Sequence, residues 1–166
     1  MKWLLVVTAI GLAALAGCDG PKVEPNGLGN YRFGHTTIAN IHDGNCQPTE
    51  LRDGRKAIWC FGLPPIKVGK RVAEVDAYFN AMPPFDPKTT APMIELQLKV
   101  RGCSEDEAER WIRERFGPPI ESKSTREYWK NSFVWVGAFL PSEPGRCLIH
   151  ILPLSENAEI DRIKAE

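Results

Sequence analysis

The segment MIELQLKVRGCSEDEAERWIRERFGPP, residues 93–119, decides the predicted fold because it places a strand directly before a helix. Apolar and polar residues alternate without a break over Met93–Arg101, which is the pattern of a strand with one buried face. Over Ser104–Phe116 the apolar residues recur at helical spacing, and Gly-Pro-Pro then ends the helix. We therefore expect an antiparallel strand followed by an amphipathic helix.

The first turn of this helix carries a capping signal. Ser104 and Glu107 match the S-x-x-E capping box, in which each side chain bonds a backbone N–H at the start of the helix. Acidic residues fill the first turn and arginines the last, which suits the helix dipole. The sequence predicts that Ser104 and Glu107 cap the helix reciprocally.

Further strands are expected on both sides of this segment. Arg71–Asn80 fits either a helix or a strand, and we favour a strand because it can pair with Met93–Arg101. The connecting loop, residues 81–92, contains four prolines that prevent a helix. The other expected strands are Ala57–Gly62, Glu127–Lys130, Phe133–Leu140 and Cys147–Leu152. Residues 156–166 read as a solvated helical tail.

The two halves of the chain follow a similar pattern. Gly34-His35-Thr36 and Gly102-Cys103-Ser104 each lead into a helical stretch, and strands bearing Trp59 and Trp129 follow. This pattern predicts one α+β domain over residues 31–155. In it, two α-β-β-β repeats, about 31–101 and 102–155, would form an antiparallel sheet with the helices packed on one face.

The N-terminus predicts export and a lipid anchor. Lys2 precedes an apolar run, residues 3–17, that is shorter than the roughly 20 residues a membrane-spanning helix needs, so residues 1–17 read as a signal peptide. Leu15-Ala16-Gly17-Cys18 resembles the lipobox of bacterial lipoproteins. This resemblance implies that Cys18 is acylated and becomes the N-terminus, which anchors the protein to a membrane.

Asp19 bears on which membrane holds the anchor. It resembles the sorting signal of enteric-type lipoproteins, in which Asp after the lipidated Cys favours retention in the inner membrane. We therefore expect an inner-membrane protein that faces the periplasm, with the outer membrane as the alternative. Residues 18–30, which begin with the lipidated Cys, are rich in glycine and proline and read as a flexible tether.

The four cysteines after Cys18 predict two disulfides. Cys46, Cys60, Cys103 and Cys147 are an even number in an exported chain, and they allow three connectivities. Buried free thiols are the alternative. A zinc site is disfavoured because no two of these cysteines have C-x₂₋₄-C spacing.

A family resemblance bears on the first half of the chain. Residues 31–62, YRFGHTTIANIHDGNCQPTELRDGRKAIWCFG, resemble the first unit of the secreted beta-lactamase inhibitory proteins. The Gly-x-Thr/Ser start before a helix is also similar to outer-membrane-assembly lipoproteins of the BamE type. The resemblance implies tandem helix-plus-sheet units and a Cys46–Cys60 bridge. With each bridge kept inside one repeat, the second pair is Cys103–Cys147.

Enzymatic chemistry is not favoured by the sequence. The chain lacks the nucleophile-elbow, phosphate-loop and H-E-x-x-H patterns, and we predict no catalytic residue, metal or cofactor. The alternative is a small periplasmic hydrolase or metal-handling protein centred on His42, Asp43 and His35. The charges balance, with 21 Lys and Arg against 21 Asp and Glu and no clustered basic face, so nucleic acid is not an expected partner.

Aromatic residues favour protein binding instead. Over Phe133–Leu140 both faces of the expected strand are apolar. One face of this strand would pack against the helices. The other face would expose aromatic side chains to solvent, and such side chains are typical of protein-binding hot spots. The expected binding residues are Trp59, Tyr78, Lys99, Arg101, Phe133 and Trp135. The alternatives are that the proline-rich loop covers them or that the two faces of the strand are reversed. The leading prediction is a lipid-anchored envelope protein that binds a periplasmic or membrane protein.

Overall fold

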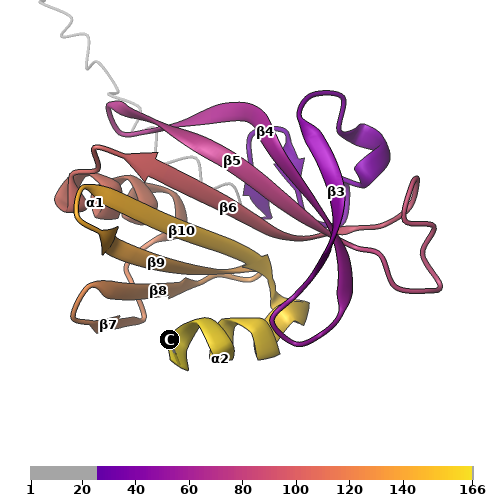
Figure 1. Cartoon of the computed structure of the whole chain (residues 1–166). Coiled ribbons are helices and arrows are strands. Elements are labelled where there is room, and N and C mark those ends of the chain that lie inside the picture. Colours follow the sequence, from indigo (N-terminus) through magenta and orange to yellow (C-terminus); the bar gives the residue numbers. More distant parts are fainter. Residues whose placement is uncertain (1–25, 166) are drawn as a thin grey trace, which may run out of the picture.

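The framework of the protein is a twisted, eight-stranded antiparallel sheet with the strand order β3-β4-β5-β6-β10-β9-β8-β7 (Figure 1). This computed structural model describes residues 26–165. The strands are β3 (Asn45–Glu50), β4 (Lys56–Val68), β5 (Arg71–Asn80), β6 (Met93–Arg101), β7 (Glu121–Lys123), β8 (Arg126–Lys130), β9 (Val134–Glu143) and β10 (Arg146–Pro153). The predicted signal peptide, Cys18 and Asp19 lie outside the described residues.

Smaller elements flank this sheet. A two-stranded sheet joins β1 (Gly27–Leu28) to β2 (Tyr31–Arg32). The α-helices of the described residues are α1 (Glu105–Phe116) and α2 (Asn157–Ala165), and the 3-10 turns are η1 (Ile38–Asn40) and η2 (Leu154–Glu156).

Two meanders of four strands each build the large sheet. β3 to β6 follow one another across one half, β7 to β10 follow one another across the other, and β6 pairs with β10 at the seam. Leu98 lies opposite Ile149 in this seam, and Arg101 lies opposite Arg146. The seam therefore brings residues about 50 positions apart in sequence side by side. No local sequence pattern predicts this pairing.

The predicted α+β fold of two α-β-β-β repeats is wrong, because the protein is mostly β and each half supplies four strands. The strands of the large sheet that are missing from the prediction are its two edge strands, β3 and β7. Their residues are mostly polar and almost all exposed, so no alternation marks them. The helix expected near Ile38 is only the three-residue turn η1.

The helices do not share one face of the sheet, as the prediction required. α1 packs into the main core, and it contributes the buried side chains of Ala108, Trp111, Ile112 and Phe116. α2 lies on the opposite face, where Ile160 and Ile163 cluster with Tyr128 and Leu152 (Figure 1). The absence of a side chain at Gly137 allows α2 to pack closely on the sheet, since a Cβ there would come within 3.3 Å of the Ile160 Cδ1 atom.

The C-terminal segment is therefore not the solvated tail that its sequence predicts. Ile160 and Ile163 are both buried, at 1% and 0% exposure. Two large apolar residues in a segment that is rich in charged residues give only a weak amphipathic pattern, which explains the wrong prediction.

The start of α1 is held differently from the predicted capping box. Ser104 is the N-cap residue but makes no side-chain cap hydrogen bond. The Glu107 carboxylate instead accepts the backbone N–H of Lys70 at 2.7 Å. Gly69 makes room for this contact, since a Cβ there would lie 2.5 Å from the Glu107 Cγ atom. Glu107 thus ties α1 to the β4–β5 turn.

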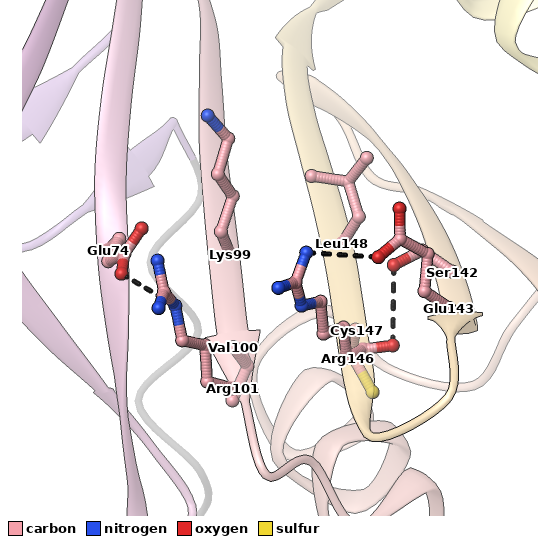
Figure 2. A pocket seen from close by; sticks show the side chains of 9 residues that line it. All are labelled: Glu74, Lys99, Val100, Arg101, Ser142, Glu143, Arg146, Cys147 and Leu148. Atoms are coloured by element: carbon pink, nitrogen blue, oxygen red, sulfur yellow. Dashed lines mark hydrogen bonds and ion pairs between the residues drawn. The ribbon is translucent and has the colours of Figure 1, made fainter.

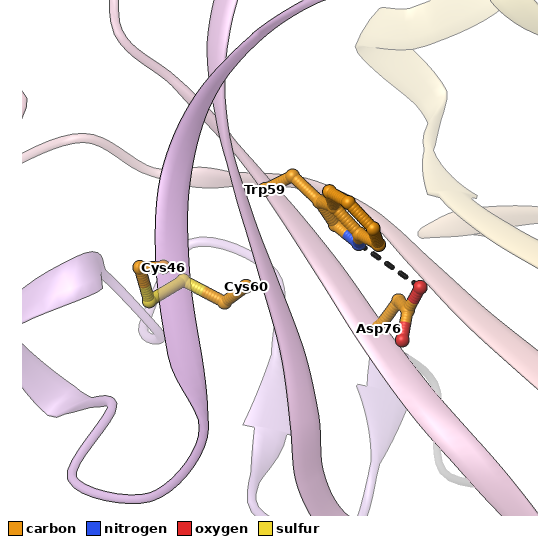
Figure 3. Close-up of a disulfide and its surroundings, with 4 residues drawn as sticks. All are labelled: Cys46, Trp59, Cys60 and Asp76. Atoms are coloured by element: carbon orange, nitrogen blue, oxygen red, sulfur yellow. Dashed lines mark hydrogen bonds between the residues drawn. A yellow bond between two sulfur atoms is a disulfide. The ribbon is translucent and has the colours of Figure 1, made fainter.

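The predicted disulfides are confirmed as Cys46–Cys60 and Cys103–Cys147. Cys46 and Cys60 lie directly opposite each other on β3 and β4 (Figure 3). The second bridge joins the segment before α1 to the start of β10. The first bridge lies within the first meander, whereas the second joins the segment that directly follows β6 to β10 and so crosslinks the two halves of the sheet beside the seam.

Candidate protein-binding face

The sheet face opposite α1 is covered only in part. α2 lies over one end of it, and the β3–β4 turn, residues 51–55, reaches α2 from the other half (Figure 1). Ion pairs join this turn to the C-terminal segment: Arg52 Nη1 lies 3.2 Å from Glu159 Oε1, Arg162 pairs with Asp53, and Arg55 pairs with Glu156 of η2. We call η2 and α2 together with the 51–55 turn the clamp.

A buried polar cluster lies on this face of β6 and β10. His150 Nδ1 lies 2.6 Å from Glu95 Oε1, and the Gln97 amide donates to the same oxygen at 2.8 Å. Glu95 is 5% exposed and His150 is 1% exposed. Burial by itself would raise the pKa of Glu95, but the hydrogen bond and charge of His150, with help from Gln97 and Arg52, hold that pKa below its usual value.

A cavity of about 140 Å³ adjoins this cluster beneath the clamp. Tyr78, Glu95 and Gln97 line it from the sheet, and Arg52 and Glu159 line it from the clamp. Burial, followed by the negative charges of Glu95 and Asp76, raises the pKa of Tyr78 to about 12. Tyr78 therefore stays neutral over the ordinary pH range.

The open part of the face carries an aromatic cluster that consists of Trp59, Phe61 and Tyr78. The ring of Trp59 lies 4.6 Å from that of Phe61 and 6.4 Å from that of Tyr78, measured between centroids. All three side chains are partly exposed. The alternation of β4 turns Trp59 to this face and Cys60 to the core (Figure 3).

One buried carboxylate fixes the position of Trp59. The indole Nε1–H donates to Asp76 Oδ2 at 2.9 Å (Figure 3). Lys99 Nζ donates to the same oxygen at 2.6 Å and lies 5.8 Å from the centre of the Trp59 ring. Asp76 is 4% exposed. Its buried carboxylate therefore positions both the Trp59 ring and the Lys99 ammonium group.

Figure 2 shows a shallow depression of about 330 Å³ on the same face, and it shares Lys99 with the surroundings of Trp59. Its side chains come from four strands: Glu74 on β5, Lys99 and Arg101 on β6, Arg146 and Leu148 on β10, and Ser142 and Glu143 on β9. Arg101 pairs with Glu74 at 2.9 Å and Arg146 with Glu143 at 3.0 Å, and all four side chains are more than half exposed. Such pairs contribute little to stability, so either arginine can exchange its partner for a carboxylate on another molecule.

The predicted binding residues do not all lie together. Trp59, Tyr78 and Lys99 gather as expected, and Arg101 lines the depression beside them. Trp135 is separate, because α2 lies beside it and Asn157 accepts its indole N–H at 2.8 Å. Phe133, which is 53% exposed, lies in the turn before β9. The alternative that the proline-rich loop covers the face does not hold, since the loop extends away from the sheet (Figure 1).

Several residues of this face are missing from the sequence prediction. Phe61 and Asp76 lie next to Trp59, while Arg146 and Leu148 complete the depression from β10. The alternation of β4 places Phe61 on the same side as Trp59, so the sequence could have identified it. Arg146 and Leu148 depend on the β6–β10 pairing, for which the sequence carries no signal.

The histidine alternative finds little geometry to support it. His42 and Asp43 line a small surface depression of about 150 Å³, and His35 is not among its lining residues. All three are exposed. Residues 26–165 contain no group of three or more His, Cys, Asp or Glu side chains arranged to hold a metal ion.

No known protein family, curated protein or solved structure matches this chain. Within the described residues, neither α-helix has the length and apolar character needed to cross a bilayer.

Proposed function

We propose that this protein is a lipid-anchored component of a bacterial cell envelope that binds a protein partner through the open face of its sheet. The observation that supports this proposal is the partly exposed aromatic cluster of Trp59, Phe61 and Tyr78 beside a shallow depression lined by Lys99 and Arg101. Aromatic and arginine side chains supply most of the binding energy in protein interfaces.

The cluster is also organised before any partner arrives. The bond from Trp59 to Asp76 and the contact with Lys99 hold the indole in one orientation. A side chain that is already ordered loses little conformational entropy on binding. The two exposed arginine–glutamate pairs lie at the rim of the depression. They favour a partner that presents both acidic and basic side chains, with its carboxylates opposite Arg101 and Arg146.

The anchor belongs to the same proposal. Acylation of Cys18 would hold the domain at a membrane surface through the residues between Cys18 and β1; the predicted tether, residues 18–30, is too long, because Leu28 of β1 is already buried in the core. Asp19 favours the inner membrane, with the sheet facing the periplasm. The partner is then a periplasmic protein or the periplasmic part of a membrane protein, and nucleic acid is not a partner.

Site-specific photo-crosslinking in intact cells tests the face. A benzophenone side chain is placed at Phe61 or Leu148 on the face, and at Glu114, exposed on α1, as the control position. We expect a discrete protein adduct from the face positions alone. Trp59→Ala should abolish it, whereas Ile120→Ala, at an exposed apolar residue away from the face, should leave it unchanged. Equal adducts at all three positions would reject the proposal.

The anchor is tested separately with the full chain. Cys18→Ser should eliminate labelling by a clickable palmitate analogue and release the protein from membranes. Asp19→Ser should shift the labelled protein toward the outer membrane in an enteric host. Undiminished lipid labelling of the Cys18→Ser variant would contradict the anchor without bearing on the face.

A further inference from the structure

The cavity of about 140 Å³ beneath the clamp has a wall of hydrogen-bonding side chains. Tyr78 and Glu95 lie directly opposite each other on β5 and β6, and Gln97 follows two residues along β6 on the same face. Glu95 is buried, and Gln97 is only 9% exposed. The strand register therefore brings a phenol, a carboxylate and an amide together at one wall of the cavity.

Each of these three side chains keeps an oxygen without a hydrogen-bond partner in the described part of the chain. Glu95 Oε1 is shared by His150 Nδ1 and the Gln97 amide, which leaves Glu95 Oε2 without a donor. Gln97 uses its amide N–H₂ in that bond, so its Oε1 atom is unused, and the Tyr78 hydroxyl makes no hydrogen bond. Neither Glu95 Oε2 nor Gln97 Oε1 is sealed off from solvent. Three acceptors thus border the same cavity.

The Glu95–His150 pair leaves negative charge at this wall. His150 Nε2 is buried and has no hydrogen-bond partner within residues 26–165. A neutral His150 that donates its Nδ1–H to Glu95 leaves no N–H without an acceptor, whereas a protonated ring would leave one at Nε2. In the neutral form, the pair carries the single negative charge of the Glu95 carboxylate.

The other charged side chains at the cavity are engaged in ion pairs. These pairs are Glu159 with Arg52 and Arg162, and Glu50 with Lys56. The charge that remains at the wall is therefore that of Glu95. Burial, followed by the charge of Glu95, raises the pKa of Tyr78, which agrees with a negative potential at the phenol.

We propose that this cavity binds a primary ammonium group, which donates its N–H bonds to Glu95 Oε2, Gln97 Oε1 and the Tyr78 hydroxyl. An ammonium group has three donors and no acceptor, which matches three unused oxygens beside one negative charge. The remaining space suits a short alkyl chain, because Leu51 and the Tyr78 ring also line the cavity. The ammonium group belongs to a small free amine or to a lysine side chain of another protein.

Other small occupants match this wall less well. A carboxylate or a phosphate would lie against the Glu95 anion. A divalent metal ion needs several ligands, and no group of three or more His, Cys, Asp or Glu side chains is arranged to hold one within residues 26–165. Water alone is the remaining alternative, and a ligand titration distinguishes it from an amine site.

Nuclear magnetic resonance of the full chain in a maltoside detergent tests the site at about pH 8, where alkyl amines are protonated. The probe is n-butylammonium, and n-butanol and butyrate are the matched ligands without an ammonium group. The side-chain amide of Gln97 is the reporter, because it bonds Glu95 in the cavity wall. We expect its signal to shift saturably with the amine alone, with a Kd on the order of 1 mM for so small a ligand.

Variants locate the binding. Glu95→Gln removes the charge and keeps the size of the side chain, so it should weaken binding by about tenfold or more. Tyr78→Phe removes one acceptor and should weaken binding by about fivefold. Glu74→Gln, at an exposed carboxylate on the same face, should leave the affinity unchanged. The comparison of the amine with the alcohol needs no variant, so it decides the question even if Glu95→Gln does not fold.

Nα-acetyl-lysine methylamide distinguishes the two sources of the ammonium group. Weaker binding of this compound than of n-butylammonium would assign the site to a free amine, and equal or tighter binding would assign it to a lysine of a protein. The inference is overturned by the absence of a saturable shift with either amine, by an equal shift with n-butanol, or by binding that Glu95→Gln leaves unchanged. None of these outcomes depends on the proposal for the open face, since the titration uses no protein partner.

Discussion

The two faces of the sheet are made by the same strands, yet they have different roles. On β6, Leu96, Leu98 and Val100 point toward α1 and are almost fully buried. Their neighbours Glu95, Gln97 and Lys99 point to the opposite face, which carries the polar cluster and the candidate binding surface. The face toward α1 supplies most of the apolar burial, so the opposite face can carry polar and aromatic residues that serve other purposes.

The difference is visible in how each face is closed. α1 and the strands enclose one continuous apolar cluster on one side. On the other side, a small apolar cluster under α2 is combined with ion pairs that join η2 and α2 to the 51–55 turn. Apolar packing is insensitive to pH, whereas ion pairs and buried carboxylates respond to it. The two faces should therefore differ in their sensitivity to truncation and to pH.

The largest effect should come from truncation on the face toward α1. Leu98→Ala removes a fully buried side chain opposite Ile149 and should lower the free energy of unfolding by about 2–5 kcal/mol. Leu148→Ala, at a partly exposed leucine on the neighbouring strand, should cost about 1 kcal/mol or less. Urea unfolding followed by circular dichroism measures both. Similar losses for the two variants would contradict the contrast between the faces.

The second effect concerns the polar cluster on the opposite face. Glu95→Ala leaves His150 Nδ1 and the Gln97 amide buried without their shared partner, so we expect a loss of about 1–3 kcal/mol. Glu74→Ala is the matched control, because this carboxylate lies on the adjacent strand, on the same face, and is more than half exposed. It should change stability by less than about 0.5 kcal/mol.

The cost of Glu95→Ala should also depend on pH. The pKa of Glu95 is lower in the folded protein than its ordinary value of 4.5, so its carboxylate stabilises the fold fully above that pH. This contribution is lost as the pH falls further, through the folded pKa. The difference in unfolding free energy between the wild type and Glu95→Ala should shrink from pH 6 toward pH 3. A difference that stays constant would rule out this linkage.

Much of the face toward α1 could be predicted from the sequence, since its signals are local. The bounds of β5 and β6 match the alternation over Arg71–Asn80 and Met93–Arg101, and α1 matches its helical period. The disulfide pairing followed from keeping each bridge within one half. Each half was wrong by one polar edge strand. β3 is held by pairing with β4 and by Cys46–Cys60 rather than by an apolar pattern, and the exposed residues of β7 are held by pairing with β8.

The opposite face was harder to predict, because its burial depends on distant parts of the chain. Glu95 and Gln97 look like solvent-facing residues of an alternating strand, and both are buried in the folded protein. Trp135 looks like a neighbour of Trp59, yet the Asn157 side chain at the start of α2 accepts its indole N–H. Neither outcome can be read from local periodicity, since both require knowing where α2 and the 51–55 turn pack.

The third effect concerns the clamp and should be smaller. Arg55→Ala removes ion pairs to Asp53 and Glu156 that are only partly shielded from solvent, so we expect a loss of about 0.2–1 kcal/mol. Hydrogen exchange of the α2 amides should accelerate while that of β6 does not. Lys56→Ala is the control, because its pair with Glu50 is largely exposed and should contribute nothing measurable. Unchanged exchange in α2 would mean that the ion pairs do not hold the clamp.

The smallest effect at neutral pH, and the one that best separates the two faces, is that of Tyr78→Phe. The Tyr78 hydroxyl makes no hydrogen bond within residues 26–165, so the variant should lie within about 0.5 kcal/mol of the wild type at pH 7.

The pKa of Tyr78 is about 12 in the folded protein and near 10 when the chain unfolds. The neutral phenol is therefore favoured in the fold, and the wild type should lose stability as the pH rises from about 10 toward 12. Tyr78→Phe should lose less over the same range, and ultraviolet titration should show one tyrosine fewer with a raised pKa. Identical alkaline losses in both proteins would show that Tyr78 is not held in a shielded, negatively charged environment under the clamp.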